Sequence, residues 1–114
     1  KQRVEIFFMK DKDNWDLEKV FRKIKNKKIY ISFDVDCFDV SIMPATGTPE
    51  PGGMLWDDCL KILKDIIFKS NLIGLDVNEL SPISGGHAYD FLVARLVYKI
   101  LNYNLISQNK VNSH

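Results

Sequence analysis

The sequence predicts an α/β fold built on a parallel sheet. Three apolar segments with strand character alternate with three segments in which apolar residues recur at helical spacing. This alternation is typical of parallel strands that are joined by right-handed helical crossovers. The strand segments are almost continuously apolar, as expected for strands that helices cover on both faces. We therefore expect the chain order β-α-β-α-β-α.

The first half of the chain contains two predicted strands and the helix between them. Residues 4–9 (VEIFFM) are apolar and β-prone, and a polar turn follows that can cap a helix. From Trp15 onward, apolar residues at positions 17, 20, 21 and 24 predict an amphipathic helix. Residues 28–36 (KIYISFDVD) are the second predicted strand, and a long loop then continues to about residue 54.

The second half supplies two more helices and the last strand. Residues 55–69 and 88–103 each carry an apolar helical stripe, and residues 72–80 (LIGLDVNEL) form the third predicted strand. The end of the chain is polar, so we expect a domain over residues 1–106 and a frayed tail over residues 107–114. Three strands leave open sheet edges, and the first residue is not Met, so we expect part of a larger domain.

The composition narrows the class of protein. A chain of 114 residues with 46% hydrophobic and 27% charged residues is an ordinary soluble domain. The net charge of +1 gives no reason to expect nucleic acid or a membrane surface as a partner. No apolar run approaches the ~20 residues that span a bilayer. The two cysteines form neither a metal motif nor a disulfide framework, so a cytoplasmic location is expected.

Acidic side chains stand at the carboxyl ends of the second and third predicted strands, where open α/β sheets bind ligands. Asp34 and Asp36 are two residues apart, so on one strand they would share a face. Two such carboxylates repel each other unless a cation lies between them, and hard ions such as Mg²⁺ or Mn²⁺ fit that role. A solvated strand end or a loop-capping aspartate is the alternative that the pair alone leaves open.

The loop after these acids is expected to be stiff. Residues 43–53 (MPATGTPEPGG) contain three prolines and three glycines, which impose a specific path on the backbone. Such a loop is typical of the wall of a site, although a crossover with nothing to bind gives the same pattern. Glu50 either lines the mouth of a pocket or faces water. Asp39 is either a hydrogen-bond acceptor behind the ligands or a turn residue.

Together these segments resemble the ureohydrolase family of arginases, agmatinases and their relatives. The resemblance rests on SFDVD (32–36), Asp39, PATGTPEPGGM (44–54) and GLDVNELSP (74–82), and it extends through FLVARLVYKIL (91–101). The Glu-Pro pair before the paired glycines resembles agmatinases more than arginases. The resemblance implies the C-terminal portion of an arginase-like, three-layer α/β/α fold.

The resemblance also implies roles for three side chains. Asp34 and Asp36 match manganese ligands, and Glu79 matches the catalytic glutamate that pairs with the guanidinium of the substrate. The implied reaction is hydrolysis of agmatine to putrescine and urea, a step of polyamine biosynthesis that uses two Mn²⁺ ions and the hydroxide they hold. The implied enzyme is a cytoplasmic homo-oligomer with a small guanidino compound as its substrate.

The family's Gly-Gly-Asp-His and Asp-Ala-His-x-Asp motifs do not occur in this sequence. His87 and His114 lie in no motif, and the soft thiol of Cys37 is expected to pack instead of binding manganese. Two aspartates cannot complete a two-metal site, so we expect the remaining ligands in a missing N-terminal half of the domain. The alternatives are a non-catalytic, truncated α/β module that serves as an oligomerisation or regulatory partner, and a hydrolase of formimino or guanidino-acid substrates.

Overall fold

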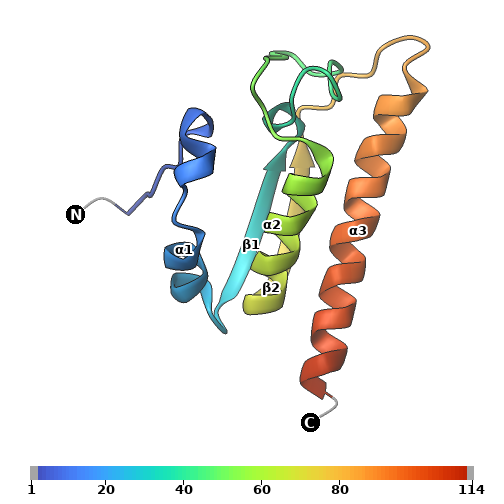
Figure 1. Cartoon of the computed structure of the whole chain (residues 1–114). Coiled ribbons are helices and arrows are strands. Elements are labelled where there is room, and N and C mark those ends of the chain that lie inside the picture. The colour runs from blue at the N-terminus through green and yellow to red at the C-terminus, as the bar shows by residue number, and fades with distance from the viewer. Residues whose placement is uncertain (1–2, 113–114) are drawn as a thin grey trace.

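A parallel sheet of two strands forms the centre of the computed structural model, which describes residues 3–112. The strands are β1 (Lys28–Asp34) and β2 (Asn71–Asn78), and Figure 1 shows them side by side with two long helices next to them. The pairing shifts register once, after Ile29, and then runs without interruption to the ends of both strands. The predicted α/β class with a parallel sheet is thereby confirmed.

The core lies between one face of the sheet and the helices α2 (Trp56–Lys69) and α3 (His87–Asn112). Alternate residues of β1 are buried or half-buried, which is the period of two expected for a strand with one covered face. The helix α2 lies against the sheet, and α3 packs against α2. Buried side chains from these layers include Phe33, Leu63, Ile67, Leu72, Leu96 and Ile100.

The prediction of a strand over residues 4–9 is wrong. Residues 4–8 have no regular secondary structure, and they lead into the 3-10 helix η1 (Met9–Asn14). Val4 and Ile6 are 70% and 69% exposed. A β-prone segment becomes a strand only when it pairs with a neighbour, and no strand of residues 3–112 pairs with this one. The order of elements is η1, α1, β1, η2, α2, β2, α3.

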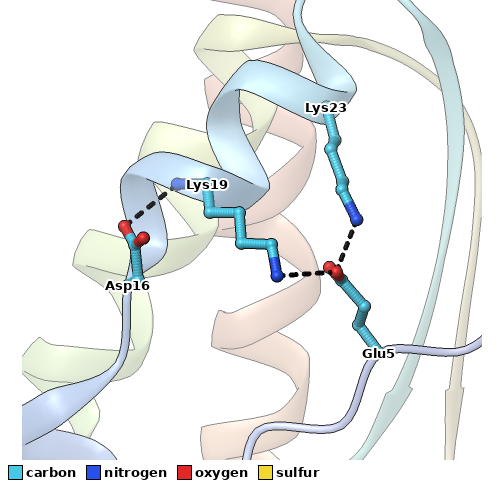
Figure 2. Close-up of polar contacts among 4 residues, drawn as sticks. All are labelled: Glu5, Asp16, Lys19 and Lys23. Atoms are coloured by element: carbon cyan, nitrogen blue, oxygen red, sulfur yellow. Dashed lines mark hydrogen bonds and ion pairs between the residues drawn. The ribbon is translucent and has the colours of Figure 1, made fainter.

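Polar contacts instead connect the N-terminal segment to the helix α1 (Leu17–Ile24). Figure 2 shows the carboxylate of Glu5 between the ammonium groups of Lys19 and Lys23, with Lys19 at 3.0 Å. The hydrogen bond from Lys23, followed by that from Lys19, lowers the pKa of Glu5. Asp16 caps the helix by accepting from the backbone N–H of Lys19 at 3.1 Å. Exposed ion pairs of this kind orient the segment more than they stabilise the fold.

The last helix is longer than the predicted 88–103, because it continues to Asn112. Ser107 is buried, and its hydroxyl donates to the carbonyl oxygen of Ile67 at 3.4 Å, which keeps the later turns against α2. Residues 107–112 are therefore helical and not frayed, and the predicted boundary at residue 106 falls inside the helix. Although α3 is long, neither it nor any other helix of the described chain has the apolar length needed to cross a membrane.

Candidate metal and substrate site

The carboxyl ends of β1 and β2 meet at one edge of the sheet. Asp34, the last residue of β1, pairs in register with Asn78, the last residue of β2, and Glu79 follows directly. Figure 1 shows the loop after β1 and the segment after β2 at this same end of the molecule. Both acidic side chains are exposed. The structure thus brings the backbones that carry Asp34 and Glu79 together, as the parallel sheet predicts.

Glu79 has an unusual backbone conformation for a residue with a side chain. Its φ of 71° lies in the left-handed region, which glycine adopts far more readily. Strained conformations of this kind cluster at functional sites. This conformation occurs directly after the last residue of β2, at the strand end that faces the loop after β1.

Asp36 is not on the strand, because β1 ends at Asp34 and the 3-10 helix η2 (Val35–Cys37) follows. The prediction of a strand to residue 36 is therefore two residues too long, and the alternation of a strand does not relate Asp36 to Asp34. Val35 and Phe38 are both buried, and their spacing of three residues matches one 3-10 turn. Asp36 is half-buried, and Thr48 donates to it at 3.5 Å.

Asp39 closes the loop that runs from residue 38 to residue 54. Its carboxylate accepts hydrogen bonds from the backbone N–H groups of Ser41, Gly52 and Gly53 at 2.9, 2.7 and 3.2 Å, and also from the Ser41 hydroxyl. These bonds, those from Ser41 above all, lower the pKa of Asp39 to about 2. Asp39 is thus a loop acceptor that joins the two ends of the segment.

The base of the loop is also closed by the backbone. Met54 donates to the carbonyl oxygen of Cys37, and Asp39 donates to that of Met54, both at 2.9 Å. At Gly53 a Cβ atom would lie 2.5 Å from the backbone nitrogen of Asp39, which is closer than real Cβ atoms approach. Only glycine allows the two sides of the loop to come this close.

The same loop is connected to the segment after β2. The backbone N–H of Ser81 donates to the carbonyl oxygen of Ala45 at 2.8 Å, and both Met43 and Ala45 are buried. Beside Ala45, the hydroxyl of Thr46 is buried without a hydrogen-bond partner among the described residues. The loop that contacts Asp36 and the segment that carries Glu79 are therefore parts of one packed unit.

A cavity of about 180 Å³ lies beside Asp36. Its lining includes Asp36, Cys37 and Glu50, and the remaining residues are Met9, Pro51, Gly52 and Gly53. Of the two alternatives for Glu50, the structure therefore favours the residue that lines a pocket. Asp34 and Glu79 do not contribute to this lining. The described residues thus bring Asp36 and Glu50 into one cavity and leave Asp34 and Glu79 at the open strand ends.

A second polar cluster lies on the sheet next to these strand ends. The carboxylate of Asp76 accepts from Ser32 at 2.7 Å, from Tyr30 at 2.8 Å and from the amide of Asn78. The hydrogen bond from Ser32, followed by those from Tyr30 and Asn78, lowers the pKa of Asp76. The bond to Asp76 in turn raises the pKa of Tyr30. This cluster joins β1 to β2 directly before Glu79.

The carboxylate oxygens at the end of β1 and in η2 are of the kind that fits part of a manganese site. Asp34 and Asp36 offer carboxylate oxygens, which Mn²⁺ prefers to thiols. Residues 3–112 contain no group of three or more His, Cys, Asp or Glu side chains placed to hold a metal ion. His87 is the exposed first residue of α3, and His114 lies outside the described residues. Two aspartates alone do not make a complete set of ligands for a metal centre.

Sequence reasoning missed one contact at this site. The hydroxyl of Thr48 donates a hydrogen bond to the carboxylate of Asp36. Thr48 stands in the PATGTPEPGGM segment, so the position of that segment directly after the acids could have indicated it. The packing expected for Cys37 agrees with its contacts with the core.

Comparisons with known proteins agree on one family. The model of the arginase family matches residues 1–102. The chain is 36% identical over 102 residues to the N(1)-aminopropylagmatine ureohydrolase of Synechocystis sp., a match that covers 90% of this chain and 33% of the relative. It is 43% identical over 70 residues to an agmatinase of Neisseria meningitidis serogroup C, covering 58% of this chain and 22% of the relative.

A solved structure supports the same relationship at the level of the fold. The agmatine ureohydrolase of Thermoplasma volcanium superimposes with a TM-score of 0.73 and 26% identity, over 90% of this chain and 35% of that protein. The chain thus spans about a third of the length of the relatives that it matches over most of its own length.

Proposed function

The chain belongs to the arginase family, and we propose from this membership that it forms part of a manganese-dependent hydrolase that cleaves a guanidino compound. The substrate that we propose is agmatine, and the products are putrescine and urea. The names of two relatives, an agmatinase and an agmatine ureohydrolase, support this choice. The known relatives are hydrolases, so a reaction of this class is the simplest one for the site.

The observation that carries the proposal is the meeting of the two strand ends. The register of Asp34 with Asn78 brings a carboxylate of β1 next to the segment of Glu79, and the η2 turn adds Asp36. We assign Asp34 and Asp36 as manganese ligands and Glu79 as the catalytic residue that binds the substrate. A planar guanidinium suits Glu79, because a carboxylate can accept two parallel hydrogen bonds from it. Bound manganese supplies hydroxide near neutral pH and stabilises negative charge.

The proposal also includes the source of the remaining metal ligands, the oligomeric state and the location of the enzyme. The remaining metal ligands come from protein outside these 114 residues, in the N-terminal half of the complete domain. The assembled enzyme is a homo-oligomer in the cytoplasm and binds a small molecule, not nucleic acid or a membrane. The two unpaired thiols, Cys37 and Cys59, are compatible with a reducing compartment.

A second candidate substrate is N(1)-aminopropylagmatine, which carries the same guanidino group on a longer amine. The relative that matches 90% of this chain is named for this substrate. Both substrates present the same guanidinium to Glu79, so they differ only in the length and charge of the chain behind it. Urea release from the two compounds, compared under the same conditions, distinguishes the candidates.

Manganese binding by the 114-residue chain tests the proposed ligands. We expect binding, measured by the electron paramagnetic resonance signal of free Mn²⁺, that both Asp34→Asn and Asp36→Asn weaken. Asp90→Asn is the matched control, because Asp90 is an exposed carboxylate at the start of α3. Manganese binding that neither Asp34→Asn nor Asp36→Asn weakens would favour the alternative that the chain is a non-catalytic module.

Urea release tests the reaction itself. The chain is assayed with agmatine and Mn²⁺, and any release is expected to disappear in Asp34→Asn and Glu79→Gln. If the chain binds manganese but releases no urea, the reaction requires the metal ligands that we place outside these 114 residues. Release that survives both substitutions would contradict the proposed site.

A further inference from the structure

We propose that a cavity between the ends of α1 and α2 binds a small phosphate monoester that carries an apolar organic group. The cavity has a volume of about 380 Å³. Figure 1 shows the ends of both helices at the end of the molecule where β1 begins, away from the loop after β1. Neither the proposed manganese ligands nor Glu79 line this cavity. It is therefore a second site, and the proposal does not depend on the proposed hydrolysis.

Three cations and one carboxylate line this cavity. Arg22 lies in α1, Lys25 directly follows α1, Lys69 is the last residue of α2, and Glu18 is the carboxylate. Three positive charges and one negative charge give the lining a net charge of +2. Within residues 3–112, none of the three cations forms an ion pair with a carboxylate. The cavity therefore offers positive charge that the described chain does not neutralise.

The N-terminal segment neutralises other cations of α1. Lys19 and Lys23 both pair with Glu5, as Figure 2 shows. Arg22 and Lys25 are three residues apart, a spacing that places side chains on one face of a helix. This second face borders the cavity. The basic residues of α1 are thus divided between a paired face and a face that is open to a ligand.

Backbone hydrogen bonds hold the two helix ends together at the cavity. The N–H of Asn26 donates to the carbonyl oxygen of Lys69, and the N–H of Lys27 donates to that of Ile24, both at 2.9 Å. Asn26 has a φ of 58°, in the left-handed region that asparagine adopts more readily than most residues. These bonds also occupy a carbonyl group at each helix end, where unpaired carbonyl groups would repel an anion.

Two aromatic rings form the apolar part of the lining. Phe21 is buried and Phe68 is half-buried. The ammonium group of Lys69 lies 4.9 Å from the centre of the Phe21 ring, a distance at which the ring attracts a cation. This contact holds the charge of Lys69 next to the apolar surface.

The lining determines the class of ligand. A phosphate monoester carries about −1.5 to −2 charges at pH 7, which matches the net charge of the lining. The guanidinium of Arg22 can donate two parallel hydrogen bonds to phosphate, and the lysines add compact positive charges. An apolar organic group can also cover the rings of Phe21 and Phe68, which inorganic phosphate cannot do. The ester should therefore bind more tightly than inorganic phosphate.

Titration of the isotope-labelled 114-residue chain with phenyl phosphate, followed by nuclear magnetic resonance, tests the site. We expect the amide signals of Lys25, Asn26 and Lys69 to shift and to saturate at millimolar concentrations, with weaker binding of inorganic phosphate. Shifts that do not saturate, or equal affinity for the two ligands, would overturn the proposal. Binding to vesicles that contain phosphatidic acid, without binding to phenyl phosphate, would also overturn it.

Charge substitutions at the cavity should have effects of opposite sign. Arg22→Gln and Lys25→Gln should each weaken the binding of phenyl phosphate by about tenfold, because each removes a charged hydrogen-bond donor. Glu18→Gln should tighten binding, because it removes the negative charge of the lining. Lys61→Gln is the matched control, since Lys61 is an exposed cation of α2 that lines a different cavity.

The three substituted residues of the cavity are exposed, so the variants should fold, and the resonance spectrum of each variant checks this. An equal loss of affinity in Lys61→Gln would show that phosphate responds only to the overall charge of the chain. Weaker binding in Glu18→Gln would contradict the proposed lining. The comparison of phenyl phosphate with inorganic phosphate uses the unsubstituted chain and does not depend on any variant.

Discussion

At the scale of single residues, Asp39 and Gly53 determine the path of the loop beside the proposed ligands. Asp39 gathers hydrogen bonds from both ends of the loop, and Gly53 provides the space for that approach. Neither residue is assigned to metal or substrate. They affect the site indirectly, because they position Thr48 on the same loop and Asp36 on the turn before it.

Asp39→Asn should reduce stability in a pH-dependent way. The folded chain lowers the pKa of Asp39 from 3.8 to about 2, so its ionised form stabilises the fold. That contribution is complete above pH 3.8 and is lost as the pH falls toward about 2. We expect the variant to unfold at lower urea concentration than the unsubstituted chain at pH 7, with the difference shrinking toward pH 2. A difference that stays constant over this range would contradict the role of the carboxylate.

Gly53→Ala should destabilise the loop. The added Cβ would lie 2.5 Å and 2.6 Å from backbone atoms of Asp39 and Phe38, so the backbone has to move. Overpacking of this kind costs about 1–3 kcal/mol, measurable as the free energy of unfolding in urea. Gly47→Ala is the matched control in the same loop, because nothing lies within 4 Å of its added Cβ. Equal losses in the two variants would show that the close approach at Gly53 does not matter.

At the scale of elements, hydrophobic periodicity predicted the helices well and the strand ends less well. Cys59, Leu63 and Ile67 recur on one side of α2 and are buried, as the helical spacing indicates. The periodicity could not show that residues 4–8 pair with no strand of residues 3–112, or that α3 continues beyond residue 103. Both outcomes depend on what lies beside the segment, and a local pattern does not contain that information.

Leu96→Ala should destabilise the interface between α2 and α3. Leu96 is completely buried in the core, so its truncation leaves a cavity that costs about 2–5 kcal/mol. Leu101→Ala on the same helix removes a side chain that is 56% exposed and should change stability by about 0.5 kcal/mol or less. Thermal and urea unfolding of the two variants measure the difference. Similar losses would mean that α3 packs in another orientation.

At the scale of the whole molecule, the chain is elongated. Its radius of gyration is 15.1 Å and its extents are 48 × 34 × 23 Å, whereas a compact domain of this length has a radius of gyration of about 13 Å. The 26 residues of α3 explain the difference, because a helix of that length runs about 39 Å and extends past the strands.

Small-angle X-ray scattering tests this shape. At low protein concentration the radius of gyration should be close to 15.1 Å. If the proposed homo-oligomer forms, the value should rise with concentration, because large apolar side chains such as Phe91, Tyr98 and Leu105 are exposed along α3. A value near that of a compact domain would mean that α3 folds back on the sheet.

The sequence by itself determined the α/β class, the family, the helix α2 and the meeting of Asp34 and Glu79 at one edge of the sheet. These follow from apolar periodicity and from motifs that are continuous along the chain, so no distant contact is needed to recognise them. The roles of Asp34, Asp36 and Glu79 in metal and substrate binding stay predictions.

Only the tertiary structure decided which residues hold the site in place. Asp39 with Gly53 and Thr48 with Asp36 are contacts between residues that are separated along the chain. Such contacts arise when the loop folds over the strand end, and their energies depend on distances that no local pattern contains. The η2 turn also depends on tertiary packing. Both Val35 and Phe38 are buried, and the strand ends before Asp36.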